Sequence, residues 1–403
     1  MKKSMIVAAM LAMVATGANA KSATDSATIA KNKPVFTVVK QNPITSIKDQ
    51  NRSGTCWAYS TLSYFESEIL KHTGKTYDLS EMFVANKTYM DRATMAVRMH
   101  GDVSFSQGGS AYDVLYALQH YGIVPEGAMP APGTLTGDSL ANFGEFFDVM
   151  TPYVEAVAKS NAKKISSAWK SGLQGIIDSY IGKTPEKFTY QGKQYTPQSF
   201  CQSLGLKLDD YVTITSYTHH PMWSKFAVEV QDNWRWPLSY NVPMDDLCKI
   251  IDNAINNGYT VAWGGDVTED GFTRKGLGIA YDVKKVRSMA GTDADHWFKL
   301  SKDEKKEKFD SLGVNAPEVV PTQAMRQEAF DNWETTDDHG MHIYGIAKDQ
   351  NGKEYYMVKN SWGEYGDYKG TWYMTKAFVA YKTMDFMVNK NAIPKDIRKK
   401  LGI

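Results

Sequence analysis

Residues 50–60 read Q-N-R-S-G-T-C-W-A-Y-S, and the rest of this chain is best understood outward from them. Cys56 directly follows a Ser-Gly-Thr turn and begins an apolar pattern of helical spacing that stops at Gly74, which predicts a helix starting at Cys56. Unsatisfied backbone N–H groups at a helix start favour a negative charge, so we expect this position to lower the pKa of the thiol. The alternative is a buried structural cysteine.

The composition is that of a globular protein with a sizeable core. The chain has 403 residues, of which 42% are hydrophobic and 23% charged, and its net charge is +1. No basic excess is present to neutralise phosphates, which argues against binding of nucleic acid or of a membrane surface. No stretch is long and apolar enough to span a bilayer. No Cys/His spacing resembles a zinc site, and no glycine-rich phosphate loop follows a predicted strand.

The first 20 residues read as a secretory signal peptide. Lys2 and Lys3 precede an apolar run from Met5 to Ala15, and the sequence A-N-A at residues 18–20 supplies a small-x-small cleavage pattern. We therefore expect an exported protein, periplasmic or secreted, whose mature chain begins near Lys21.

The cysteine count also singles out Cys56. The other two cysteines are Cys201 and Cys248, and an odd number leaves at least one thiol unpaired in an exported protein. Cys201 and Cys248 either form a disulfide or are two free buried thiols, and the sequence leaves both alternatives open. Cys56 is unpaired in either case.

The predicted elements change character along the chain. The first third is mostly helical, and residues 130–240 contain further predicted helices and no internal repeat. Near the C-terminus, strands are predicted at Met341–Ala347 and Tyr355–Lys359 around a hairpin turn at residues 349–352. Helices first and an antiparallel sheet last predict one α+β unit of two lobes with a cleft between them.

A cysteine nucleophile needs a base, a group that orients the base, and donors for the oxyanion, and the sequence offers a candidate for each. His339 lies where a predicted loop enters a strand. His342 is its rival, and because residues three apart on a strand point to opposite faces, only one should serve. The carboxamide of Asn360 could accept the ring N–H of the base. The amide of Gln50 could join the backbone N–H of Cys56 in donating to the oxyanion.

Four segments together resemble papain-type cysteine peptidases. They are residues 50–60, Q-G-G at 107–109, H-G-M-H-I-Y-G-I at 339–346 and N-S-W-G-E at 360–364. More narrowly, the chain is similar to the bleomycin hydrolase and aminopeptidase C branch. It has Ser53 where papain has a disulfide cysteine, it has a long insertion before His339, and it has similar segments at residues 259–267, 325–328 and 336–339. The resemblance covers most of residues 40–395.

The resemblance implies a role for each candidate residue. His339 rather than His342 occupies the family's position for the base. Gly108 and Gly109 correspond to a loop whose backbone pairs with an extended substrate, which requires glycine for close approach. The implied site consists of Cys56 as nucleophile, His339 as general acid and base, Asn360 as orienting residue, Gln50 as oxyanion donor, Gly108 and Gly109 for substrate, and Trp57 and Trp362 in support.

The implied fold is papain-like and two-lobed, with the nucleophile helix in a helical lobe and the His and Asn in an antiparallel β lobe. We expect a single peptidase domain at residues 21–403, with no metal or organic cofactor. Its parts are a helical lobe at about 45–130, a long, mainly helical insertion at about 131–240, a β-rich lobe at about 241–394 and a short C-terminal tail at 395–403. The family also suggests a homo-oligomer, a ring-like hexamer.

The implied reaction is hydrolysis of peptides, and the cleft decides which bonds are reached. In this branch a C-terminal tail returns into the cleft, and its carboxylate can hold the free amine of the substrate. Only nine residues follow Pro394 here, so an endopeptidase or a dipeptide-releasing peptidase is the alternative. Residues 21–45 are too short for the folded inhibitory propeptide of exported papain-type endopeptidases, which favours an aminopeptidase. A catalytically silent binding module is a third hypothesis, although no triad residue is lost. Side-chain preference and physiological substrate stay open.

Overall fold

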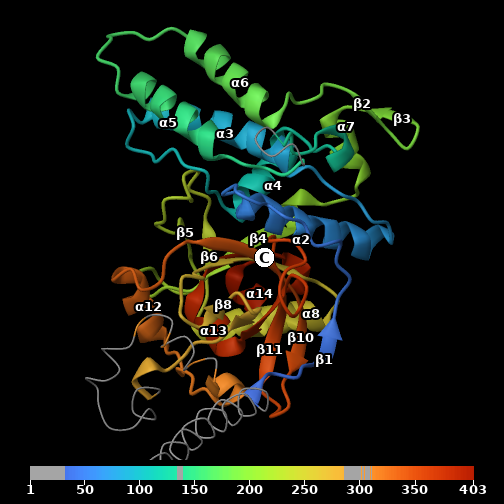
Figure 1. The fold of residues 1–403 in the computed structure, drawn as a ribbon, viewed down its shortest axis with the longest axis vertical. Coiled ribbons are helices and arrows are strands. Elements are labelled where there is room, and N and C mark those ends of the chain that lie inside the picture. Colours follow the sequence, from blue (N-terminus) through green and yellow to red (C-terminus); the bar gives the residue numbers. More distant parts are fainter. Residues whose placement is uncertain (1–31, 134–138, 286–300, 302–303, 305–308, 310) are drawn as a thin grey trace, which may run out of the picture.

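The computed structural model describes residues 32–133, 139–285, 301, 304, 309 and 311–403. The expected signal peptide, residues 1–20, lies outside them. A helical layer stacks on a large β-sheet, and α2, the helix that begins at Cys56, lies between the two (Figure 1). This arrangement agrees with the predicted two-lobed α+β fold.

The helical layer contains six α-helices among the described residues, and its helix starts follow local capping rules. The side chain of Ser80 accepts a hydrogen bond from the Phe83 N–H at the start of α3, and Ser110 and Asp113 form a capping box at the start of α4. The helices are α2 (Cys56–Thr73), α3 (Glu81–Arg98), α4 (Ala111–His120), α5 (Gly144–Ala158), α6 (Ala168–Ile181) and α7 (Pro197–Ser203), with a small hairpin of β2 (Phe188–Tyr190) and β3 (Lys193–Tyr195).

The main sheet runs in the order β5-β6-β4-β13-β7-β10-β11-β12-β9-β8, and β1 pairs with β10. The predicted hairpin of β10 and β11 is observed, with Gly352 at a positive φ of 82° in the turn. The strands are β1 (Thr37–Gln41), β4 (Tyr211–Thr215), β5 (Lys225–Phe226), β6 (Ser239–Asn241), β7 (Val261–Gly265), β8 (Phe272–Thr273), β9 (Leu277–Gly278), β10 (His339–Lys348), β11 (Glu354–Lys359), β12 (Thr371–Thr375) and β13 (Thr383–Asn389).

The sheet is mixed rather than wholly antiparallel, which corrects one part of the expectation. β10 pairs antiparallel with β7 and β11, but β4 pairs parallel with β6, and β9 pairs parallel with β12. The parallel pair of β4 and β6 arises because β5 forms a hairpin with β6, so β6 returns beside β4 in the same direction. The domain limits given above stay a prediction; within the range expected for the insertion, residues 211–241 contribute three strands to the sheet.

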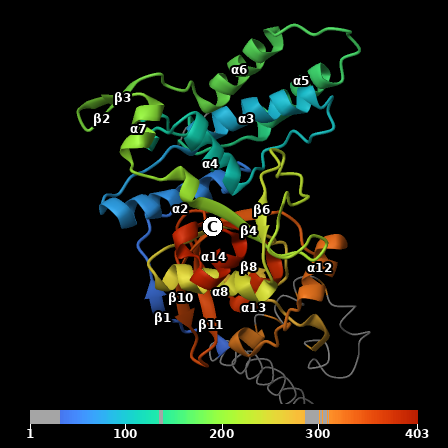
Figure 2. The same cartoon turned by 180° about the vertical axis from the view of Figure 1, so that it is seen from behind.

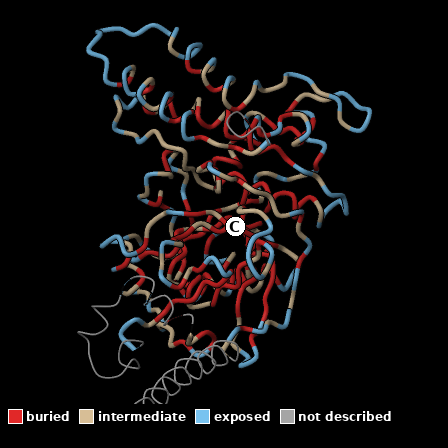
Figure 3. The backbone as a smooth tube through the Cα atoms, in the orientation of Figure 1, coloured by how far each residue is buried: buried red, intermediate tan, exposed pale blue. Residues whose placement is uncertain are grey.

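The two faces of the sheet pack against different partners. On β7, Ala262 belongs to the core shared with the helical layer, and the next residue, Trp263, belongs to the core on the other face. Figure 3 shows this second core as a dense buried region in the lower body. It is covered by α8 (Met244–Asn256), α13 (Lys376–Lys382) and α14 (Lys395–Leu401), while α12 (Gln323–Asp331) lies to one side. Short 3-10 turns occupy Glu126–Ala128, Leu208–Asp210, Gly313–Asn315 and Lys390–Ala392.

The expected C-terminal tail is the helix α14. Its buried residues Ile397 and Leu401 pack in the same cluster as Ile250 of α8, on the face of the sheet opposite α2. Figure 2 shows α8 and α14 together below α2. Residues 395–403 are therefore separated by the sheet from the helix that carries Cys56.

All three cysteines are free thiols. Cys201 lies on α7 in the helical layer, whereas Cys248 lies on α8 on the far side of the sheet. Of the two alternatives, the structure thus selects free thiols over a disulfide.

β10 crosses the start of α2 at Gly340. A methyl group on this glycine would lie 2.7 Å from Ser60 Oγ and 3.3 Å from the carbonyl oxygen of Cys56. Glycine therefore allows the strand to approach the helix closely enough to bring the neighbouring His339 to Cys56.

We predict that Gly340→Ala destabilises the fold by about 1–3 kcal/mol, because the added methyl group overpacks the contact between strand and helix. Urea unfolding followed by circular dichroism measures this free energy. Gly127→Ala is the matched control, since a methyl group there meets nothing within 4 Å. Equal unfolding free energies of the two variants would contradict the proposed close contact.

Candidate active site

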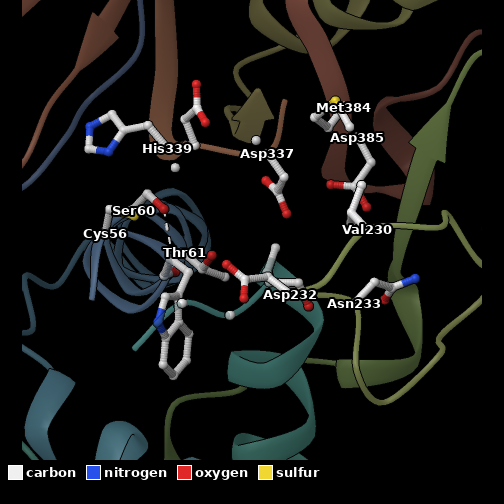
Figure 4. Close-up of a pocket in the computed structure, with 18 of the residues that line it drawn as sticks. Cys56, Ser60, Thr61, Val230, Asp232, Asn233, Asp337, His339, Met384 and Asp385 are labelled. Carbon is white, nitrogen blue, oxygen red and sulfur yellow. Dashed lines mark hydrogen bonds between the residues drawn. The ribbon is translucent and has the colours of Figure 1, made fainter. Parts of the chain in front are cut away.

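A cavity of about 250 Å³ opens beside the start of α2. Its walls come from α2, from the loop before α4, from the segment between β5 and β6, and from β7, β13 and the start of β10. Figure 4 shows Cys56 and His339 on one side of it. Of the candidate residues, those that line the cavity are Cys56, Trp57, Gly108, Gly109 and His339.

Cys56 is the first residue of α2, as predicted, and it is partly exposed. The predicted lowering of its pKa is not observed, because burial outweighs the helix start and raises the pKa of the thiol to about 11. The backbone N–H groups of Gly340 and Trp57 stabilise the thiolate and oppose this shift, whereas the carboxylates of Asp337 and Asp232 add to it. The thiol therefore needs a base to become a nucleophile near neutral pH.

His339 is oriented by Asn360. Its Nε2 lies 2.8 Å from Asn360 Oδ1, which also accepts a hydrogen bond from the backbone N–H of Ser361. Since that oxygen can only accept, Nε2 carries the ring proton and Nδ1 is left as the basic nitrogen. The ring of Trp362 lies 5.0 Å from the His339 ring and covers it on one side.

The imidazole of His339 is neutral in this environment. Burial lowers its pKa to about 4, and the hydrogen bond to Asn360 opposes this shift only in part. A neutral thiol thus faces a neutral imidazole. Transfer of one proton between Cys56 and His339 creates the thiolate without changing the net charge of the buried pair.

The rival histidine points elsewhere, as the strand geometry predicts. His342 is fully buried between β10 and α2, where its Nδ1 lies 2.9 Å from Ser63 Oγ, and it does not line the cavity with Cys56. Burial, followed by the charge of Lys359, lowers its pKa well below the usual value.

Gln50 is buried behind the cavity and joins the two halves of the candidate site. Its Nε2 donates to the carbonyl oxygen of Ser53 at 2.7 Å, and its Oε1 accepts from Ser361 Oγ at 2.6 Å. One amide hydrogen of Gln50 is used in this way. Its predicted role as oxyanion donor depends on the second hydrogen and stays a prediction.

The glycine loop is fixed to α2 and to the turn before it by two hydrogen bonds. Trp57 Nε1 donates to the carbonyl oxygen of Gln107, and the side chain of Gln107 accepts from the backbone N–H of Gly54. A methyl group on Gly109 would lie 2.8 Å from the Trp57 ring, which explains the glycine at this position. Trp57 therefore supports the loop from beneath.

Sequence reasoning missed the carboxylates in the cavity, which come from Asp232, Asp337, Asp338 and Asp385. Asp337 and Asp338 immediately precede His339, and this adjacency was the available signal. Asp232 lies in an aromatic-rich segment without a motif, and only the fold brings it to Cys56.

The described residues contain one group that could hold a metal ion, formed by His219, His220 and Glu229. Their candidate ligand atoms lie within 4.8 Å of one another. Both histidines are hydrogen-bonded to the Glu229 carboxylate at 3.0 Å, and the group does not line the cavity with Cys56. The geometry at Cys56 involves no member of this group.

We predict that His339→Ala shifts alkylation of Cys56 by iodoacetamide to alkaline pH. Without the imidazole, no neighbouring base accepts the thiol proton and the thiolate forms only at alkaline pH, whereas proton transfer to His339 supplies it near neutral pH in the wild type. Alkylation rates measured across this pH range give the profile. His342→Ala is the control and should retain the wild-type profile. An unchanged profile in His339→Ala would exclude His339 as the base.

Comparisons with known proteins agree with this geometry. Residues 2–402 match the model of the Peptidase C1-like family. The chain is 23% identical over 397 residues to aminopeptidase G of Lactobacillus delbrueckii subsp. lactis, covering 89% of this chain and 84% of the relative. It is 24% identical over 410 residues to aminopeptidase C of Lactobacillus helveticus, covering 90% and 85%.

The fold is similar to the crystal structure of PepW from Lactobacillus rhamnosis HN001, with a TM-score of 0.68 at 18% sequence identity. The superposition covers 99% of this chain and 95% of PepW. This similarity shows the papain-like fold. The chain therefore belongs to the Peptidase C1-like family and is a papain-like cysteine peptidase.

Proposed function

We propose that this peptidase is an aminopeptidase, which removes N-terminal residues from peptides through Cys56. The observation that carries the proposal is the grouping of Cys56, the Asn360-bonded His339 and several carboxylates in one small cavity. The names of the relatives, aminopeptidases G and C, support the same activity. No metal or organic cofactor enters the proposed reaction.

In the proposed reaction, His339 Nδ1 takes the proton of Cys56, and the thiolate attacks the carbonyl carbon of the first peptide bond. The backbone N–H of Cys56 and the amide of Gln50 stabilise the oxyanion. His339 then gives its proton to the leaving amine, and a thioester remains on Cys56. Water, deprotonated by His339, hydrolyses the thioester and releases the N-terminal residue.

An endopeptidase or dipeptide-releasing peptidase is the second candidate function. It is favoured by the position of α14, because residues 395–403 do not line the cavity and so do not close it. The carboxylate of Asp232 lies against the glycine loop, where it offers a negative charge to the free amino group of a substrate. This position favours the aminopeptidase instead.

Paired substrates distinguish the two functions. We predict that an aminoacyl aminomethylcoumarin is cleaved at least about 10-fold faster than its N-acetyl derivative, since acetylation removes the ammonium charge. Values of kcat/KM from fluorescence measure the ratio. Equal values would refute the aminopeptidase and support the endopeptidase.

Substitutions test the mechanism. We predict that Cys56→Ala and His339→Ala each lower kcat by more than about 1,000-fold, because each removes a partner in the proton transfer. His342→Ala should lower kcat far less, and any loss should follow thermal stability. A larger loss in His342→Ala than in His339→Ala would reverse the assignment of the base.

We also propose that the protein is exported, with peptide trimming outside the cytoplasm as its role. The lysines, apolar run and A-N-A sequence of residues 1–20 support this proposal. The described residues include no helix that combines the length and apolar character needed to cross a membrane. Fractionation of cells expressing the chain with and without residues 2–20 tests export. The hexamer suggested by the family resemblance stays a prediction that light scattering can measure.

A further inference from the structure

The cavity that contains Cys56 has a strongly acidic wall. Its lining includes Asp232, Asp337, Asp338 and Asp385 but, among the described residues, neither lysine nor arginine. Figure 4 shows Asp232 and Asp337 near the middle of the cavity, between Cys56 and Asp385. Several carboxylates on one wall favour a bound cation.

Asp232 is held in place through one of its two oxygens. Nη1 and Nη2 of the fully buried Arg92 each lie 3.1 Å from Asp232 Oδ1, and Ser106 Oγ donates to the same atom at 3.3 Å. No described residue donates to Oδ2. One oxygen therefore positions the carboxylate, and the other keeps its capacity to accept hydrogen bonds.

The second carboxylate oxygen, Asp232 Oδ2, packs against Gly108 of the glycine loop. A methyl group on Gly108 would fall 1.8 Å from Asp232 Oδ2, and the carbonyl oxygen of Gly108 already accepts from Arg92 Nη1 at 2.6 Å. A substrate that extended along this loop would meet the carboxylate at Gly108. The Asp232 carboxylate thus blocks the path along the glycine loop. It lies in the same cavity as a substrate residue that is attacked by Cys56.

Asp337 lies across from Asp232 and lacks a hydrogen-bond donor among the described residues. Burial raises the pKa of its carboxyl group well above the usual value, and the charge of Asp232 adds to this shift. A cation between the two groups would remove this repulsion.

We propose that Asp232, with Asp337 opposite it, binds the protonated α-amino group of the substrate's first residue and thereby restricts Cys56 to N-terminal peptide bonds. This inference rests on the proposed aminopeptidase function and deepens it. The carboxylate comes from the segment between β5 and β6, while residues 395–403 lie on the opposite face of the sheet.

Ammonium binding here also assists the nucleophile. Asp337 and Asp232 both raise the pKa of the Cys56 thiol. A positive charge between them offsets that effect, so a substrate with a free amine favours proton transfer to His339. The charge of the bound ammonium group thus links substrate binding at Asp232 and Asp337 to proton transfer from Cys56 to His339.

Asp232→Asn tests the proposal, because its side-chain oxygen can still accept from Arg92 while an NH2 group replaces the free oxygen. We predict that kcat/KM for the free-amine aminoacyl aminomethylcoumarin falls by about 10- to 100-fold, the usual effect of losing a charged hydrogen bond. The value for the N-acetyl substrate should stay the same or rise. Asp148→Asn, at an exposed position on α5 outside the cavity, is the matched control and should keep the wild-type ratio of the two substrates.

A change in kcat/KM that is equal for both substrates, or the absence of any change, would overturn the role of Asp232 while leaving the aminopeptidase function intact. Equal cleavage of both substrates by the wild type would instead refute the aminopeptidase function, and this inference with it. Thermal unfolding verifies the fold of each variant. If Asp232→Asn does not fold, Asp232→Ser gives the same comparison, since its hydroxyl also offers Arg92 an acceptor.

Discussion

The close approach of β10 to α2 at Gly340 is the contact on which the rest of the site depends. The cysteine begins the helix and the histidine begins the strand, and the two elements are separated by more than 280 positions in the sequence. Only a residue without a side chain lets the strand cross Ser60 and the backbone of Cys56. A second link, from Gln50 to Ser361, ties the loop before the helix to the segment that carries Asn360. Together these two contacts hold Cys56, His339 and Asn360 next to one another.

Burial determines the charge state of the Cys56 thiol and the His339 imidazole. Removal from water disfavours both the thiolate and the imidazolium, so the resting pair is neutral although the cysteine lies at a helix start. Proton transfer inside the pair conserves its net charge. Carboxylates beside the thiol make the resting state still less reactive, and a cationic substrate reverses that influence.

Much of the fold and part of the site were predictable from the sequence because they depend on local patterns. Helical spacing after Cys56 and the hairpin turn before Glu354 depend on neighbouring residues, and both were observed. Alternation along a strand also separated His339 from His342 correctly. The parallel pairing of β4 with β6 was missed, because strand order depends on contacts between distant segments. The pKa of Cys56 was predicted in the wrong direction, since the sequence shows the helix start but not the surrounding burial.

The sequence by itself determined the family and the candidate residues of the site, because these lie in short motifs whose chemistry requires particular side chains. The tertiary structure decided what surrounds them. Asp232 belongs to no motif, and it reaches the glycine loop only because Arg92 on α3 holds it there. The position of α14 was likewise decided by packing, since its apolar residues bury best against α8 on the far face of the sheet. Long-range burial and charge, which no local pattern encodes, thus shape the end of the cleft.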